Sequence, residues 1–370
     1  MNISYKKGHI SSLDGIRGIA ILLVLFFHCF EKIKVFPFNF LSEIGWVGVD
    51  LFFVLSGFLI TGILLDTKGN ENYLMSFFAK RALRIFPLYY LALLIIFIIL
   101  AIPGINHFNP VFDITHLQNS FYYFTFTQNL FFSFNGWGVT DLLNHFWSLA
   151  IEEQFYLFWP FIIFYLKTSK VLVVCTLLII IALITRNNNV DSDFSYVFTL
   201  ARVDALSIGS MLAIVIRKHN QLLNRMALPT FLITAISLLL ISYYSPNIGF
   251  RNTYFVRFGY TLFALLFASI IAFVYDKKRV GTVTNEILSL GMLRFFGTYS
   301  YGIYIYHWLL YKGVYIYFEN KYVFSKAYIL VFLCIVIIIS VISFHTFEKY
   351  FLRYKSKFEN KLYYKRSELG

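Results

Sequence analysis

The sequence predicts an all-α, polytopic integral membrane bundle of about ten transmembrane helices. Hydrophobic residues make up 59% of the 370-residue chain and charged residues only 14%, whereas a soluble domain typically has about 25% charged residues. Apolar runs near the roughly 20 residues that cross a hydrocarbon core recur along the whole chain. The density of Lys and Arg alternates between the segments that join these runs, as the positive-inside rule requires.

Ten apolar runs are expected as spans. They cover residues 13–31, 46–66, 86–104, 149–166, 171–187, 203–217, 228–245, 255–275, 296–317 and 327–347. The stretch 117–134 is aromatic but has no aliphatic core and holds Gln128 and Asn129, so we expect it to be interfacial or re-entrant. The pattern predicts one transmembrane domain over 1–352, followed by a basic cytoplasmic tail over 353–370.

The charge distribution predicts that both termini are cytoplasmic. With the N-terminus inside, most of the 32 Lys and Arg residues fall on the cytoplasmic side, and the long outer segment 104–145 has none. The net charge of +13 then faces anionic lipid headgroups, which makes membrane lipids the expected partners. The chain has no exposed basic and polar face for a nucleic acid, so we exclude that class. We expect a multi-pass protein of the cell's inner (cytoplasmic) membrane.

Several kinds of site are not indicated by the sequence. Cys29, Cys175 and Cys334 lie in separate spans without C-x-x-C spacing, and they are expected to be small apolar residues. H-E-x-x-H is absent, so no metal is expected, and the absence of G-x-S-x-G argues against a serine hydrolase. Lys6 and Lys7 precede an apolar run without a small-residue cleavage site, so a cleaved signal peptide is not expected.

The first span carries two ionisable residues on one face. Arg17 and His28 are separated by about three helical turns, or roughly 16 Å along the axis. They therefore lie near opposite membrane surfaces, and such residues inside a membrane are candidates for function. His28 can act as a general base near neutral pH. The alternative is a buried histidine bonded to a neighbouring span. Asp14 and Arg17 are three residues apart and can pair.

A basic cluster lies at the cytoplasmic edge of the third span. Arg81 and Arg84 are one helical turn apart and follow Lys80, so their guanidinium groups could grip one polyphosphate group. The alternative is an ordinary basic flank that fixes membrane topology.

Two adjacent carboxylates open the fourth span from the outer side. Glu152 and Glu153 suit the positive end of the helix dipole, which is one sufficient explanation for them. Because adjacent residues differ by about 100° around a helix, at least one should point into the bundle. There it could orient a histidine or hold a substrate hydroxyl. His145, Trp147 and Ser148 precede this pair and are candidates for substrate binding.

Other intramembrane polar residues are weaker candidates for substrate binding. Asp50 lies near the outer end of the second span, where Ser56 and Gly57 more simply permit close helix packing. Asp204, near Arg202, could instead pair with other buried charges. His307 is a second histidine, in the ninth span. The aromatic and Asn-rich outer segment 104–148 is either an interfacial belt or a platform for sugars.

Six blocks together closely resemble the integral-membrane acyltransferase family 3, which includes O-antigen and exopolysaccharide O-acetylases. They are LDGIRGIAILLVLFFH (13–28), GWVGVDLFFVLSGFLIT (45–61), FFAKRALRIFPLYY (77–90), HFWSLAIEEQFYLFWP (145–160), RVDALSIGSMLA (202–213) and FGTYSYGIYIYHW (296–308). They occur in the family's order and cover nearly the whole chain.

The resemblance implies an enzyme that moves an acyl group from cytoplasmic acyl-CoA, by default acetyl-CoA, to a hydroxyl, often on a sugar. The family's arginine–histidine motif corresponds to Arg17 and His28, and its basic motif corresponds to Lys80, Arg81 and Arg84. Its S-x-x-x-E-E block corresponds to Ser148, Glu152 and Glu153. Many relatives carry an added extracytoplasmic hydrolase-like domain. This chain ends shortly after the tenth span, so we expect it to complete transfer alone or to pass the acyl group to a separate extracytoplasmic protein.

The residues and the resemblance lead to one mechanistic hypothesis. The basic cluster holds the CoA phosphates, and His28 takes the proton of an acceptor hydroxyl while Glu152 or Glu153 orients its imidazole. Alternatively, His28 carries the acyl group covalently. The rival classes are a transporter or flippase of a lipid-linked sugar, a non-catalytic structural or sensory membrane protein, and an acyltransferase with a non-sugar acceptor.

Overall fold

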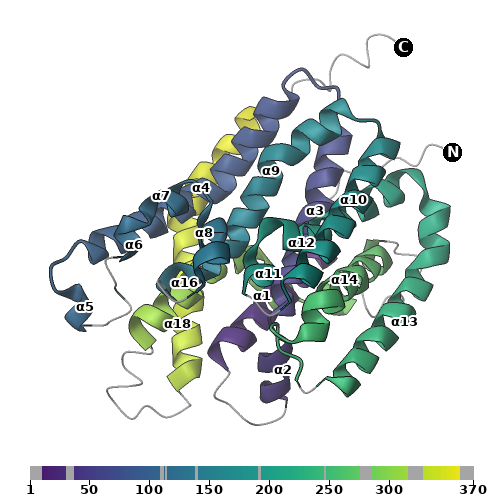
Figure 1. Ribbon diagram of the computed structural model, residues 1–370. Helices are drawn as coiled ribbons and strands as arrows, with labels where there is room; N and C mark the ends of the chain where they lie inside the picture. The colour runs from purple at the N-terminus through teal and green to yellow at the C-terminus, as the bar shows by residue number, and fades with distance from the viewer. Residues whose placement is uncertain are drawn as a thin grey trace.

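The computed structural model describes residues 11–30, 37–108, 112, 115–137, 141–190, 193–245, 247–275, 286–315 and 328–358. Within these ranges the regular structure is helical and no strand occurs. The long helices run alongside one another and form a bundle (Figure 1). The all-α fold class is therefore confirmed.

The bundle consists of long helices joined by short ones. The long helices are α1 (Ser11–Cys29), α3 (Val47–Thr67), α4 (Tyr73–Leu100), α9 (Trp147–Tyr165), α10 (Thr168–Asn188), α12 (Thr199–Lys218), α13 (Asn220–Tyr244), α14 (Tyr260–Tyr275), α16 (Gly291–Leu310) and α18 (Tyr328–Ser343). The short elements are α2 (Phe38–Ile44), α5 (Ile105–Phe108), α6 (Thr115–Gln118), α7 (Ser120–Phe124), α8 (Gln128–Asn135), η1 (Asp141–Phe146), α11 (Phe194–Val197), η2 (Phe255–Gly259), η3 (Tyr311–Tyr315), η4 (Phe344–Glu348), α19 (Lys349–Arg353) and η5 (Tyr354–Phe358).

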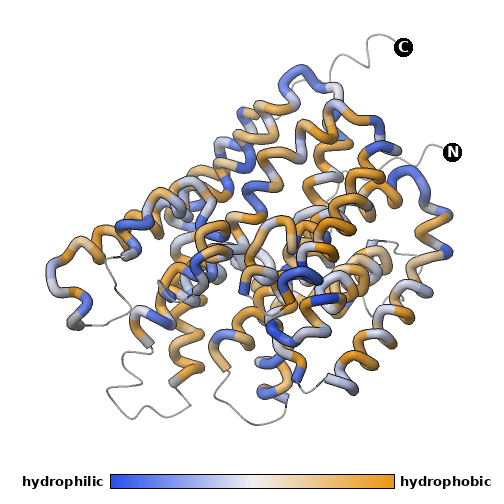
Figure 2. The backbone as a smooth tube through the Cα atoms, viewed as in Figure 1, coloured by the Kyte–Doolittle hydropathy of each residue, from blue (hydrophilic) through white to orange (hydrophobic). Residues whose placement is uncertain are grey.

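Eight helical segments of the described residues are long and apolar enough to cross a membrane. They are Ser11–Cys29, Val47–Thr67, Tyr73–Leu100, Thr168–Asn188, Phe194–Lys218, Gln221–Tyr244, Phe255–Tyr275 and Ile329–Phe358. Helices α9 and α16 have 19 and 20 residues but carry more polar side chains. Hydrophobic residues dominate the long helices, and hydrophilic residues gather at turns such as the one between α3 and α4 (Figure 2). The protein is a multi-pass membrane protein; the count of ten spans and the side of the termini stay predictions.

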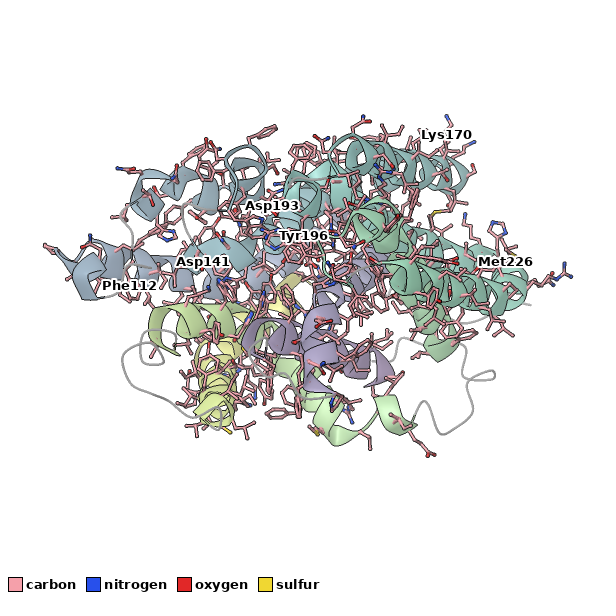
Figure 3. All side chains as sticks on the ribbon, turned by 60° about the horizontal axis from the view of Figure 1, so that its bottom comes forward. Phe112, Asp141, Lys170, Asp193, Tyr196 and Met226 are labelled. Atoms are coloured by element: carbon pink, nitrogen blue, oxygen red, sulfur yellow. The ribbon has the colours of Figure 1, made fainter. Side chains whose placement is uncertain are left out.

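Burial separates central helices from outer ones. In α3 and in the segment Phe194–Lys218, 78% of the apolar window is buried, against 17% in α10 and in α13. The outer helices expose apolar side chains, as a face in contact with lipid requires. From one end of the bundle, Lys170 and Met226 lie at the rim and Tyr196 lies near the middle (Figure 3).

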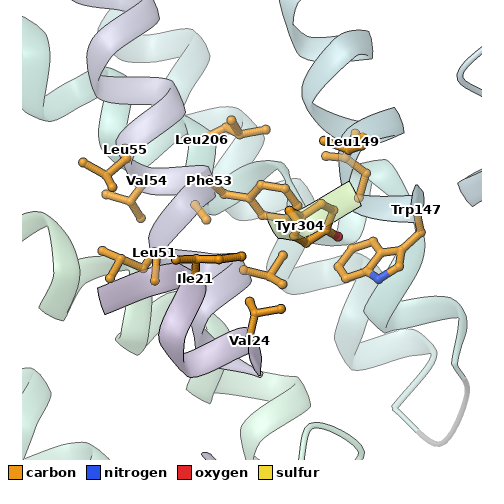
Figure 4. Packing of buried hydrophobic residues seen from close by; sticks show 14 of the residues in the cluster. Ile21, Val24, Leu51, Phe53, Val54, Leu55, Trp147, Leu149, Leu206 and Tyr304 are labelled. Atoms are coloured by element: carbon orange, nitrogen blue, oxygen red, sulfur yellow. The ribbon is translucent and has the colours of Figure 1, made fainter. Parts of the chain in front are cut away.

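Glycines allow the central helices to approach closely. A Cβ atom at Gly57 of α3 would collide with the carbonyl oxygen of Leu206 in α12, and one at Gly209 of α12 would collide with that of Val54 in α3. Phe53, Val54 and Leu206 lie together in the resulting core (Figure 4). The packing role predicted for Gly57 is confirmed.

Two helical elements, α4 and η5, extend beyond the apolar runs that predicted spans. The third span was expected to begin at residue 86, but α4 begins at Tyr73 and continues through Pro87 to Leu100. The apolar pattern stops at the basic cluster, whereas the helix does not, because the arginines face the interior of the bundle. At the start of the tail expected over 353–370, η5 packs against α4, and Ser76 donates a hydrogen bond to the carbonyl of Phe358. The rest of that expected tail lies outside the described residues.

The stretch 117–134 contains no single spanning helix. It is divided among α6, α7 and α8, which have 4, 5 and 8 residues. Gln128 and Asn129 are fully buried and hydrogen-bonded to the carbonyls of Phe146 and Val197. The amide side chains thus hold this stretch against the bundle, in agreement with the expected non-spanning segment.

Candidate active site

Three arginines line a cavity near one end of α1. Arg17 comes from α1, and Arg81 and Arg84 come from α4, one helical turn apart. We call this space the arginine cavity. Arg17 also contacts Asp14 at 3.8 Å, as predicted, and Glu152 adds one carboxylate to the wall. The arginines outnumber the carboxylates, so the cavity can receive an anionic group such as a phosphate.

The sequence of α4 explains why its arginines face inward. Phe77 and Leu88 are both buried, and they lie four residues before Arg81 and four residues after Arg84. Residues at this spacing share one helix face, so the arginines continue the buried stripe. The guanidinium of Arg81 lies 5.6 Å from the ring centroid of Tyr156, an arrangement that stabilises a cation. Lys80 lies in the same helix but does not line the cavity.

The two adjacent glutamates have different surroundings. Glu152 lines the arginine cavity and accepts hydrogen bonds from the hydroxyls of Ser56 and Tyr156, both at 2.9 Å. Glu153 turns toward a neighbouring pocket that Arg81 also lines, and its buried Oε1 atom has no hydrogen bond to the described residues. The expectation that at least one glutamate points into the bundle is confirmed for Glu152.

A second cavity, of about 720 Å³, surrounds His28 at the other end of α1. We call it the histidine cavity. Its wall is rich in aromatic and polar side chains. They include Trp46, Trp137, Asn144, His145, Trp147, Tyr196, Asn247, Phe250, Tyr304 and Trp308. Charged residues also reach it, among them Lys312 and Asp141, which form an ion pair at 2.5 Å. A cavity of this size and composition can hold a small polar molecule against flat apolar rings.

The hydrogen bond of the catalytic candidate His28 runs to a second histidine. Nδ1 of His28 lies 2.9 Å from Nε2 of His307, and the two rings are stacked with centroids 5.1 Å apart. Glu152 and Glu153 were expected to orient His28. That expectation is wrong, because both glutamates lie beside the arginines, farther along α9 than Ser148. His307 was expected to contact substrate, but its side chain is fully buried behind His28 and lines neither cavity.

The N-terminal end of α9 lies between the two cavities. The hydroxyl of Tyr304 donates to the carbonyl of His145, and the hydroxyl of Ser148 lies 2.6 Å from that of Tyr304. Tyr304 and Val49 line both cavities, so the two cavities are adjacent at these residues. Phe53, Trp147 and Tyr304 meet at this position (Figure 4).

His145 lies in η1, ahead of α9, and lines the histidine cavity. Its Nε2 atom lies 3.2 Å from the carbonyl oxygen of Ile305, and its buried Nδ1 atom has no hydrogen bond to the described residues. Burial lowers the pKa of His145 well below its usual range, and the rings of His307 and His28 act in the same direction. The ring is therefore neutral at physiological pH.

Asp50 and Asp204 belong to buried ion pairs. Asp50 binds Arg202 at 2.7 Å, and Asp204 binds Arg186 at 2.8 Å. Neither aspartate lines the two cavities, so the expectation that they contact substrate is corrected. The alternative, that Asp204 and Arg202 pair with other buried charges, is confirmed. Their carboxylates instead balance arginines that would otherwise be unpaired inside the bundle.

Some site residues were not identified from the sequence. Three polar side chains line the arginine cavity but lie within apolar runs of the sequence, namely Ser56, Tyr156 and Tyr304. Tyr156 follows Glu152 by one helical turn, and that spacing was an available signal. Lys355 on η5 lies close enough to Arg81 and Arg84 to interact with them electrostatically, because η5 packs against α4. No sequence pattern connects it with them.

Within the described residues, no group of three or more His, Cys, Asp or Glu side chains is arranged to hold a metal ion. The histidines instead contact one another and backbone carbonyls.

Comparisons with known proteins identify the family of this chain. A family model described as an acyltransferase domain matches residues 10–346. The chain therefore belongs to this acyltransferase family, the integral-membrane acyltransferase family 3. A protein of Listeria monocytogenes named peptidoglycan O-acetyltransferase OatA is 30% identical over 336 residues, covering 82% of this chain and 50% of the relative. O-acetyltransferase OatA of Staphylococcus aureus is 26% identical over 324 residues, with 82% and 51% covered.

The chain spans about half the length of the curated relatives that it matches. No solved structure matches the chain.

Proposed function

We propose that the protein is a membrane O-acyltransferase that moves an acetyl group from cytoplasmic acetyl-CoA to a hydroxyl of a cell-envelope polysaccharide or glycolipid. One observation carries this proposal: a cavity lined by three arginines and a cavity around His28 meet at Tyr304 and Val49. An anionic carrier can therefore bind on one side while its reactive end approaches a base on the other. The proposed location is the cytoplasmic membrane.

The arginine cavity is the proposed binding site for the donor. Arg81 and Arg84 bind the phosphates of CoA, and Arg17 lies where the pantetheine arm enters the bundle. Bidentate guanidinium groups match phosphate oxygens in both geometry and charge. The arm then runs past Tyr304 toward His28, which lies about three helical turns from Arg17 along α1. Glu152 keeps Tyr156 in place beside Arg81 through its hydrogen bonds.

In the proposed reaction, His28 activates the acceptor. Nε2 of His28 takes the proton of a sugar hydroxyl, and the oxygen attacks the carbonyl carbon of the thioester. The new C–O bond forms as the C–S bond breaks. The proton on His28 then passes to the CoA thiolate, so atoms and charge balance. In the alternative order, Nε2 accepts the acetyl group first and hands it to the hydroxyl afterwards.

The acceptor is proposed from the histidine cavity and from the relatives. Flat rings such as Trp137, Trp147 and Trp308 can pack against the C–H faces of a sugar, and Asn144 and Asn247 offer amides to its hydroxyls. The Listeria relative is named for peptidoglycan, so a cell-wall glycan is the acceptor class to test first. A separate extracytoplasmic transferase that receives the acetyl group is an additional proposed partner.

The test is acetyl transfer by the full chain in lipid vesicles. Acetyl-CoA labelled in the acetyl group is supplied on the arginine side, and soluble peptidoglycan fragments are supplied on the other side. We expect label on the glycan with the wild type, and a loss of about 10²–10⁴-fold in kcat with His28→Ala. Unchanged transfer by His28→Ala would contradict the mechanism. Passage of glycan across the membrane without release of CoA would indicate a transporter.

A donor without phosphates provides the control for the arginine cavity. With acetyl-CoA, Arg84→Ala should weaken donor binding by about 10–100-fold, the value of a hydrogen bond to a charged group. With acetyl-pantetheine, which has no phosphate, wild type and Arg84→Ala should bind alike. Equal losses with both donors would show that Arg84 acts on something other than the phosphates.

A further inference from the structure

We propose that His307 is a positioning residue that fixes the tautomer of His28, so that the free lone pair of His28 lies on Nε2 and faces the histidine cavity. The inference rests on the proposed function, in which His28 is the base or the acyl carrier. A histidine, with backbone carbonyls behind it, thereby performs the role for which a carboxylate was expected.

The first step is the tautomer of His307. Its Nδ1 atom lies 3.0 Å from the carbonyl oxygen of Ile303 and 2.8 Å from that of Tyr304, both one turn earlier in α16. Carbonyl oxygens can only accept hydrogen bonds, so Nδ1 of His307 must carry a proton. The His307 side chain is fully buried, and its neighbouring rings are His28, His145 and Tyr304. A charged imidazole is costly in those surroundings, so the ring is neutral and its Nε2 atom is an acceptor.

The second step is the tautomer of His28, which follows from that of His307. Nε2 of His307 lies 2.9 Å from Nδ1 of His28, and an acceptor on His307 requires a donor on His28. Nδ1 of His28 therefore carries the proton of the neutral ring. The remaining lone pair is on Nε2, which forms no hydrogen bond with the described residues. Two carbonyls of α16 thus determine which nitrogen of His28 can react.

Exposure distinguishes the roles of the two histidines. His28 is partly exposed and lines the histidine cavity, whereas His307 is fully buried and lines neither cavity. Only His28 can meet an acceptor or a thioester. His307 acts through it, because it holds the ring plane and stabilises the imidazolium that forms when Nε2 takes a proton. A hydrogen bond from a charged donor is roughly twice as strong as a neutral one.

The same stretch of α16 also holds His145. Its Nε2 atom donates to the carbonyl of Ile305, the residue after Tyr304, and its ring is perpendicular to that of His307 at a centroid distance of 5.6 Å. The carbonyls of Ile303, Tyr304 and Ile305 therefore orient two imidazoles around His28. His307 is packed on both sides and cannot turn away without displacing one of them.

The kinetic experiment compares two substitutions of His307 in the full chain. His307→Leu keeps the volume but removes the acceptor, whereas the amide oxygen of His307→Gln can replace Nε2. We expect kcat to fall by about 10²–10⁴-fold with His307→Leu and to recover by at least about tenfold with His307→Gln. The dissociation constant for acetyl-CoA should be unchanged, because the phosphates bind at the other end of α1. His345→Leu, at an exposed histidine, is the matched control.

A merely structural role for His307 predicts a different result. In that case His307→Gln would be as impaired as His307→Leu, or both variants would lose acetyl-CoA binding together with activity. Either result would overturn the proposal.

The tautomer can also be measured without any turnover. In protein labelled with ¹⁵N-histidine and placed in nanodiscs, the signals of His28 are assigned by comparison with His28→Gln. We expect a protonated Nδ1 and an unprotonated Nε2 in the wild type, and loss of that preference in His307→Leu. A protonated Nε2 in the wild type would overturn the inference. Because this measurement does not depend on acetyl transfer, failure of the proposed function and failure of this inference are distinguishable.

Discussion

A buried ion pair between Arg202 and Asp50 lies behind the aromatic wall of the histidine cavity. Arg202 is almost fully buried, bonds to Asp50, and lies 4.0 Å from the ring centroid of Tyr260. It also lies against the rings of Trp147 and Tyr196, which line the histidine cavity. The charged pair thus supports the aromatic wall from behind, because it fixes where these rings can pack.

Removing one partner of this pair should unfold the bundle more easily. We expect Asp50→Ala to lower the free energy of unfolding by about 3–5 kcal/mol, because Arg202 is then a buried charge without its carboxylate. The measurement is denaturant titration in detergent micelles. In the double variant Asp50→Leu and Arg202→Met, no charge is left uncompensated, so part of the loss should be recovered. If Asp50→Ala alone has the stability of the wild type, the pair does not support the fold.

The close contact between α3 and α12 depends on glycines, at positions where a side chain would not fit. The α3–α12 contact is built on Gly57 and Gly209, each against a backbone carbonyl of the other helix. Without a hydrophobic driving force between helices in lipid, this close backbone approach is a major source of association. Helix α3 also contributes residues to both cavities, so a shift of α3 would move Ser56 relative to Glu152 of α9.

A single methyl group at this contact should separate the helices. We expect Gly57→Ala to lower the free energy of unfolding by about 1–3 kcal/mol, the usual cost of overpacking. Thermal unfolding in detergent, followed by loss of the monodisperse peak, measures the effect. Gly291→Ala is the matched control, since a Cβ atom there meets nothing within 4 Å. Equal stability of both variants would show that the helices adjust at no cost.

Helix α4 begins before the apolar run that predicted the third span. The apolar run predicted a membrane span that begins near residue 86, because the charged residues Lys80, Arg81 and Arg84 lower the mean hydropathy before it. In the bundle these arginines face a polar cavity, so the charges do not end the helix. Pro87 lies within α4, where neighbouring helices can compensate for the lost backbone hydrogen bond.

The orientation of the whole bundle in the membrane stays a prediction from charge. It places Arg17 on the cytoplasmic side and His28 on the outer side, so that a cytoplasmic donor and an envelope acceptor can meet within one molecule. The two cavities at the two ends of α1 are consistent with that division.

Single cysteines can test this orientation in intact cells. In a background without Cys29, Cys175 and Cys334, we expect Asn135→Cys to react with a membrane-impermeant maleimide added outside. Ser169→Cys should react only after the membrane is opened. Both positions are exposed: Asn135 ends α8, which precedes α9, and Ser169 lies in the first turn of α10, which follows α9. The reverse pattern would place the arginine cavity outside and rule out a cytoplasmic donor.

Much of this architecture could be predicted from the composition of the chain and from the sequence separation of its charged residues. Length and apolarity of the runs were sufficient to predict a helical membrane bundle, because lipid requires every backbone polar group to be bonded within its own segment. The spacing along α1 was sufficient to select Arg17 and His28, because helix geometry relates sequence separation directly to face and depth. Arg81 and Arg84 were identified for the same reason.

Contacts between distant segments required the tertiary structure. His28 and His307 are 279 residues apart, and no local pattern shows that their nitrogens meet. The glutamates were assigned to His28 because a carboxylate is its usual partner, but packing places them beside the arginines. Pairing of Asp204 with another buried charge was one of the two expectations for it, but the sequence did not show which arginines bind the two aspartates, because those arginines lie on other helices. Helix geometry determines the face that a residue occupies, whereas only the packing of the bundle determines which other residue lies opposite.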